Sequence, residues 1–100
     1  MTQSRHYLIT LRPPRPRFAE TITEAEAMVI DAHFEYLSRL RDEGILCFAG
    51  RRDDAAFGLA IVRASSEQEA QGIASADPAV TGKVFTAEIA PFSIALWGAP

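Results

Sequence analysis

The sequence predicts a single α+β domain over residues 1–100, with the element order β-α-β-β-α-β of the ferredoxin-like arrangement and an antiparallel sheet. Residues 6–12 alternate with the period of a strand, and two short apolar runs, 45–49 and 57–64, flank a polar connection. Thr23 and Ser66 each begin a segment with apolar residues at helical spacing. The length of 100 residues suits one domain.

The first strand is expected at residues 6–12, where Tyr7, Ile9 and Leu11 occupy alternate positions. Residues 13–18 contain three prolines, which exclude regular secondary structure and favour an extended loop.

The first helix is expected to begin after Thr23, because Glu26 three residues later completes a capping box. It should reach about Glu43 and end at Gly44, a residue typical of the position after a helix. His33 lies within the apolar stripe of this helix, which consists of Ala25, Val29, Tyr36, Leu37 and Leu40.

The middle of the chain predicts an antiparallel hairpin, with a strand at 45–49, a polar connection at 50–54 and a strand at 57–64. Ser66 and Glu69 predict a second capping box, and the helix that follows should reach about Ala76. It should bury Ala70, Ile73 and Ala74.

A final strand is expected at residues 84–97, after Asp77-Pro78 and Gly82. Pro91 interrupts it and fits best on an edge strand or at a bulge, because proline cannot donate a ladder hydrogen bond. Neither face of the sheet is polar, because residues 57–62 and 92–97 place apolar side chains on both sides of their strands. We therefore expect a homodimer in which the two sheets face each other, with the segment after Pro91 able to cross to the partner.

Composition excludes several classes of function. A net charge of -3 argues against a nucleic-acid surface, and no apolar run approaches the ~18 residues of a membrane span. The N-terminal residues lack the apolar region of a signal peptide, so we expect a soluble cytoplasmic protein. Cys47, the single cysteine, is interpreted as a small buried apolar residue. Metal-ligand clusters and glycine-rich phosphate loops are both lacking, so neither a metal nor a cofactor is expected.

Two stretches, AHFEYLSRLRDEGILCFAG and ADPAVTGKV, resemble the YciI-like family (YCII-related domain). The resemblance implies a ferredoxin-like protomer and a homodimer of the dimeric α/β-barrel superfamily. It also implies that His33 and Asp77 form the His-Asp pair that family members are thought to use as an active site. A few members remove chloride from chlorinated hydroxyquinols, and most have no assigned reaction. The family often has Gly-Pro where this chain has Gly50-Arg51, so the rim of the pocket is expected to differ there.

Each residue of the pair has a structural interpretation beside the functional one. His33 alone is typical of a core histidine whose N–H is satisfied by a neighbour. Asp77 before Pro78 is typical of a residue that caps a short helical turn through Ala79 and Val80. A carboxylate beside an imidazole fixes the tautomer and favours the charged form, which suits a general base. The resemblance favours a functional pair.

Other polar residues near the expected site are more typical of structural roles. Tyr36 shares the helix of His33 and could donate to a substrate, although a core position is favoured. The loop arginines are interpreted as solvated charge, with an anionic substrate as the alternative; they are Arg12, Arg15, Arg17, Arg51 and Arg52.

Three functions remain open from the sequence. The first is a cofactor-independent lyase or isomerase that uses His33 as general base and Asp77 as its orienting partner on a small, anionic or aromatic substrate. The second is a non-catalytic dimer that binds or senses a small ligand. The third is a structural subunit in which the two residues form a buried polar contact.

Overall fold

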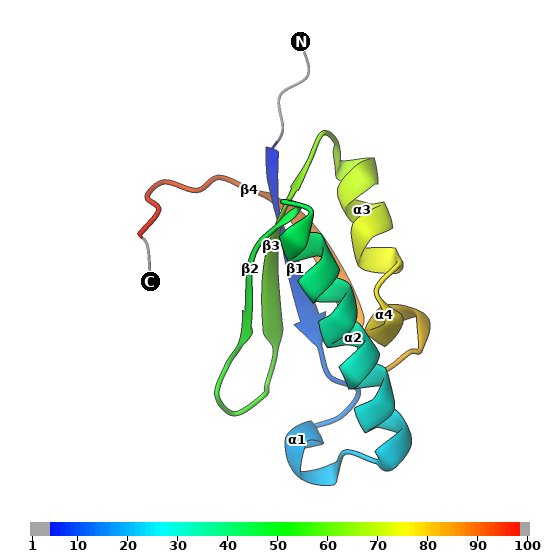
Figure 1. Ribbon diagram of the computed structural model, residues 1–100. Coiled ribbons are helices and arrows are strands. Elements are labelled where there is room, and N and C mark those ends of the chain that lie inside the picture. Colours follow the sequence, from blue (N-terminus) through cyan, green and yellow to red (C-terminus); the bar gives the residue numbers. More distant parts are fainter. Residues whose placement is uncertain (1–4, 99–100) are drawn as a thin grey trace.

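Four antiparallel strands form one sheet in the order β2-β3-β1-β4, in a computed structural model that describes residues 5–98 (Figure 1). The strands are β1 (Arg5–Arg12), β2 (Leu46–Arg51), β3 (Gly58–Ala64) and β4 (Thr86–Phe92). The helices are α1 (Phe18–Thr21), α2 (Glu24–Asp42), α3 (Glu67–Ser75) and α4 (Pro78–Thr81). Order and topology confirm the predicted α+β, ferredoxin-like fold.

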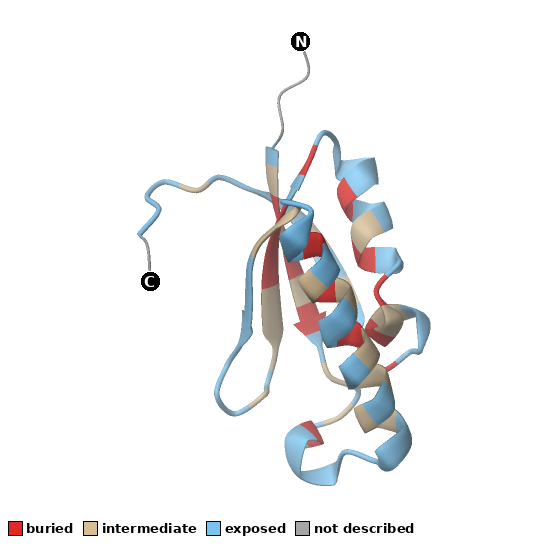
Figure 2. Cartoon of the chain, viewed as in Figure 1, coloured by how far each residue is buried: buried red, intermediate tan, exposed pale blue. Residues whose placement is uncertain are grey.

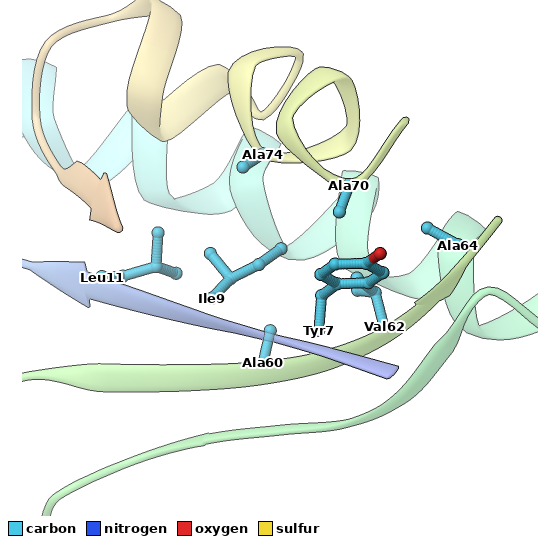
Figure 3. Close-up of a cluster of buried hydrophobic side chains, with 8 residues drawn as sticks. All are labelled: Tyr7, Ile9, Leu11, Ala60, Val62, Ala64, Ala70 and Ala74. Carbon is cyan, nitrogen blue, oxygen red and sulfur yellow. The ribbon is translucent and has the colours of Figure 1, made fainter. Parts of the chain in front are cut away.

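The helices cover one face of the sheet, and the core lies between the two layers (Figures 1 and 2). Tyr7, Ile9 and Leu11 of β1 point toward α3, whose Ala70 and Ala74 lie above them (Figure 3). Full burial of an aliphatic side chain of this size stabilises the fold by roughly 1.5–3 kcal/mol. Ala70 and Ala74 are buried as predicted, whereas Ile73 is only partly buried.

Helix α2 begins and ends where the sequence predicts. The Thr23 hydroxyl accepts from the Glu26 amide at 3.1 Å, and the Glu26 carboxylate accepts from the Thr23 amide at 2.9 Å. Gly44 follows the helix with a φ of 78°, in the left-handed region that favours glycine. The predicted stripe is wrong at Ala25, which is exposed because the first turn of α2 extends past the end of the sheet (Figure 1).

The second capping box is only half formed. The Ser66 hydroxyl accepts from the Glu69 amide at 3.1 Å, as predicted. The Glu69 carboxylate, however, accepts from the amide and hydroxyl of Ser65, at 3.2 and 2.9 Å.

Three element boundaries differ from the prediction. Residues 18–21 form the short helix α1 at the end of the expected loop. Strand β2 continues to Arg51, because Gly50 and Arg51 pair with Leu59 and Gly58. Strand β4 ends at Phe92, which pairs with His6 near the start of β1, so the partner strand runs out before residue 97. Pro91 lies on β4, an edge strand, as expected.

The sheet face opposite the helices carries large apolar side chains. Cross-strand pairing places Phe48 beside Ile61 on this face, at the edge of the sheet formed by β2. The segment after β4 leaves the sheet, and Trp97 lies near Phe48 with ring centroids 6.0 Å apart. Phe48, Trp97 and Leu96 are 46%, 59% and 93% exposed. Within residues 5–98, none of the helices has the length and hydrophobicity that crossing a membrane requires.

Candidate active site

His33 and Asp77 are in direct contact. The imidazole Nδ1 lies 2.7 Å from Asp77 Oδ2 and 2.9 Å from Oδ1. Both residues are buried, with 5% and 3% of their surface exposed. They are 44 residues apart in the sequence, on α2 and at the start of α4, so tertiary packing rather than local structure brings them together.

Asp77 also caps α4, as its structural interpretation predicts, while it contacts His33. Its Oδ1 accepts from the Ala79 amide at 2.8 Å, and Pro78 occupies the first helical position. Gly82 allows α4 to pack on α2: a Cβ at this position would lie 2.9 Å from the Pro78 carbonyl oxygen and 3.3 Å from Val29 Cγ1. The close approach holds the carboxylate against the imidazole.

The second ring nitrogen of His33 remains available. A carboxylate is an acceptor, so Nδ1 carries the proton and donates, which leaves Nε2 as an acceptor in the neutral ring. Within residues 5–98, Nε2 has no hydrogen-bond partner. Every fully buried side-chain nitrogen or oxygen in this part of the chain does have one, so Nε2 is not fully buried. Nε2 is therefore reached from the solvent side, through the cavity that His33 lines.

That cavity lies between α2, the β2–β3 hairpin and α1, and has a volume of about 760 Å³. Its walls are mostly apolar, and two aromatic rings flank the imidazole: Phe34 at 5.3 Å and Phe85 at 5.6 Å between ring centroids. The volume falls in the range of small-molecule sites, which are usually apolar with a few convergent polar groups. The polar side chains in its lining besides His33 are Ser38, Arg41, Cys47 and Arg51.

The sequence model of the YCII-related domain matches residues 7–93. The chain belongs to the YCII-related domain family. This confirms the resemblance, and the match includes β1 from Tyr7 onward, the other three strands and the two long helices.

A solved structure with the same fold is 5-chloro-2-hydroxyhydroquinone dehydrochlorinase (TftG) from Burkholderia phenoliruptrix AC1100, in complex with 2,5-dihydroxybenzoquinone. The alignment has a TM-score of 0.64 and 18% sequence identity, and covers 87% of this chain and 93% of the other. At this identity the likeness concerns the fold. A search of curated proteins gave no match.

In this YCII-related domain the loop before α2 forms one wall of the site. The Arg15 guanidinium donates to both carboxylate oxygens of Glu26, at 2.7 and 2.8 Å, and also to Thr21. These bonds fix α1, whose Phe18 and Ala19 line the cavity. The hydrogen bond from Arg15, together with the one from the Thr23 amide, lowers the pKa of Glu26 to about 2 from its ordinary value of 4.5.

We expect the Arg15–Glu26 pair to make stability acid-sensitive. The pKa of Glu26 is lower in the folded than in the unfolded chain. The carboxylate therefore stabilises the fold at a pH above its ordinary pKa of 4.5, and this effect is lost as the pH falls toward about 2. Urea unfolding midpoints should therefore fall more steeply over this window in the wild type than in Glu26→Gln. Glu24→Gln, an exposed carboxylate in the same turn, is the control. A Glu26→Gln curve parallel to the wild type would contradict the expectation.

The loop arginines separate into two groups. Arg12, Arg15, Arg17 and Arg52 form ion pairs with Glu88, Glu26, Glu20 and Asp54, as expected for solvated charge. Arg51 has no carboxylate within 4.0 Å among residues 5–98, and it lines the cavity. The sequence alone does not separate Arg51 from the other four arginines, because the ion pairs depend on the fold.

Tyr36 and Cys47, for which the sequence favours core positions, are both only half-buried. The Tyr36 hydroxyl donates to the Ile73 carbonyl at 2.6 Å, and burial followed by the charge of Asp77 raises its pKa, so this group ties α2 to α3. Cys47 is half-buried and lines the cavity rather than the core. Phe34, an exposed aromatic residue beside His33 in sequence, was a signal for the cavity wall that the sequence analysis missed. Within residues 5–98 no group of three or more His, Cys, Asp or Glu side chains could hold a metal.

Proposed function

We propose that this YCII-related domain is a small-molecule enzyme in which His33 is the general base and Asp77 its orienting partner. The observation that carries the proposal is the buried Nδ1–carboxylate contact with Nε2 facing the cavity. A group that accepts a proton must reach its substrate, and Nε2 is the one ring nitrogen of His33 that is free to do so.

The proton transfer follows from the geometry of the pair. Nε2 takes a proton from the substrate, and the resulting imidazolium is stabilised by the carboxylate 2.7 Å from Nδ1. Asp77 fixes the ring orientation, since its Oδ1 also accepts from the Ala79 amide and is held in place by that bond. The pair is buried between the Phe34 and Phe85 rings, and this apolar surrounding strengthens the interaction between imidazolium and carboxylate.

The fold neighbour suggests a reaction class. As its name states, that protein is a dehydrochlorinase, and its structure holds a small quinone. Elimination of hydrogen chloride requires a base that takes the proton while chloride departs with the bonding electrons of the C–Cl bond. A lyase or isomerase acting on a small aromatic substrate uses the same base, and aromatic side chains surround the cavity of this chain.

Chloride release tests the reaction directly. The protein is incubated with 5-chloro-2-hydroxyhydroquinone under argon, because hydroxyhydroquinones oxidise in air, and chloride is measured by ion chromatography against an enzyme-free sample. We expect release above this background. If chloride does not form, but the compound binds in a calorimeter and returns unchanged, the second function applies, a domain that binds or senses a ligand. If neither this compound nor other hydroxylated aromatics bind, the pair is structural.

We also propose that the chain forms a homodimer through the sheet face opposite the helices. The exposed aromatic residues Phe48, Phe92 and Trp97 lie at this face or on the segment beside it, where a second copy would bury them. A cytoplasmic location stays a prediction from the sequence.

Phe48→Asp should convert the dimer to a monomer, because it places a charge within the proposed apolar interface. Sedimentation velocity of both proteins measures the change in mass. Met28→Asp, which alters an exposed apolar residue on α2, is the control and should remain a dimer. A wild type that sediments as a monomer would contradict the proposed dimer.

A further inference from the structure

We propose that Arg51 determines substrate specificity by binding an anionic group, a carboxylate or phenolate, of an aromatic substrate in the cavity. The inference rests on the proposed function for the identity of the site and extends it to the chemical class of the ligand. It is carried by three observations on Arg51: its position on the sheet, its lack of a carboxylate partner, and the way its guanidinium is held.

The register of β2 directs Arg51 toward the cavity. Ala49 pairs with Ala60, a member of the core beneath the helices, so Ala49 lies on the helix face. Arg51 is two residues further along β2 and therefore lies on the same face. Its cross-strand partner is Gly58, where a Cβ would lie 3.3 Å from the Gly50 carbonyl oxygen and 3.9 Å from both Arg51 Cβ and Leu11 Cβ. Gly58 and Leu11 line the cavity beside Arg51.

The charge of Arg51 is not neutralised within the described residues. The other cation of the cavity lining, Arg41, has Asp42 at 3.2 Å, and the neighbouring Arg52 has Asp54 at 2.7 Å. An arginine without a carboxylate, at the edge of an apolar cavity, creates a positive potential at the place where a ligand enters. An anionic ligand would supply the missing partner.

The guanidinium is also held in a fixed orientation. Nη1 donates to the Arg52 carbonyl at 3.3 Å and to the Asp53 carbonyl at 3.0 Å, both in the hairpin turn. Nε and Nη2 have no partner in residues 5–98 and form one side of the planar fork that binds carboxylates with two parallel hydrogen bonds. Because two of its donor bonds are already made to the protein, less side-chain entropy is lost on binding.

A matched pair of ligands distinguishes the effect of ligand charge on affinity from the effect of ligand shape. We would titrate 2,5-dihydroxybenzoate and 2,5-dihydroxybenzamide into the wild type, Arg51→Met and Arg52→Met by calorimetry. The two compounds share a ring and hydroxyl groups and differ in one negative charge. Arg51→Met should weaken binding of the acid about tenfold, as expected for charge-assisted hydrogen bonds, and leave the amide unchanged. Arg52→Met removes the same charge from the adjacent residue, which is paired with Asp54, and should alter neither affinity.

Each outcome decides the proposal. If Arg51→Met keeps the preference for the acid, or Arg52→Met loses it equally, the arginine does not recognise the anion. If the wild type binds neither compound, or binds both equally, the proposed ligand class is wrong. Circular dichroism checks that the exposed substitution leaves the fold intact. The outcome is independent of catalysis: a chain that discriminates the acid through Arg51, but releases no chloride, would retain the anion site and lose the proposed elimination.

Discussion

Replacing His33 with asparagine is expected to lower kcat by about 10²- to 10⁴-fold, the usual contribution of a general base, while the chain stays folded. The asparagine amide nitrogen can donate to Asp77 as Nδ1 does, so the buried carboxylate keeps a partner. The substitution offers no acceptor in the position of Nε2, and proton abstraction is lost. Chloride release measures kcat, and circular dichroism with a urea titration measures the fold.

His6→Asn provides the matched control, because His6 is the other histidine of the chain and lies on β1. It should leave kcat unchanged. The general-base role would be wrong if His33→Asn retained wild-type turnover, or if His6→Asn lowered it as much.

Replacing Asp77 should affect stability most, because this carboxylate has two buried partners. Asp77→Ala leaves the His33 N–H and the Ala79 amide without an acceptor, and we expect a loss of about 3–5 kcal/mol of unfolding free energy. Asp77→Asn can still accept from Ala79, but its amide must donate to Nδ1, which moves the ring proton to Nε2. We expect a loss of about 1–2 kcal/mol, together with at least about 10²-fold in kcat.

The comparison of the two Asp77 variants separates fold from chemistry. Urea unfolding followed by circular dichroism gives the free energies, and Asp31→Ala, at an exposed position of α2, is the control for removal of a carboxylate. Equal stability losses in Asp77→Ala and Asp77→Asn would show that the cap contributes nothing. An Asp77→Asn protein with full turnover would show that the tautomer does not matter.

The sequence predicts the parts of the fold that depend on local chemistry. The Thr23–Glu26 box and Gly44 define α2, because capping partners lie within four residues of the helix ends. Helix α1 was missed because four residues are too short for a periodic pattern, and its stability depends on bonds from Arg15. The end of β4 was misjudged because strand length depends on the partner strand, which residues 84–97 alone do not reveal.

The candidate site, like the fold, was predicted only in part. His33 and Asp77 were identified by their resemblance to a family pattern, and the contact between them follows from the packing of α4 on α2. A pocket was expected only from the resemblance, and its aromatic walls were not predicted, because Phe34 and Phe85 come from distant segments and converge only in the fold. The difference between Arg51 and the four paired arginines depends on side-chain geometry, for which sequence spacing gives no signal.

The double role of Asp77 limits how the substrate specificity of such a domain can change by mutation. One carboxylate begins α4 and holds His33, so a substitution there lowers stability and the proposed chemistry together, although to different degrees. The tip of the β2–β3 hairpin is different: residues 51–54 are exposed, and exposed positions tolerate substitution. New specificities can therefore arise by drift at the hairpin around an unchanged pair, and a library designed for altered substrates should vary the hairpin and leave Asp77 untouched.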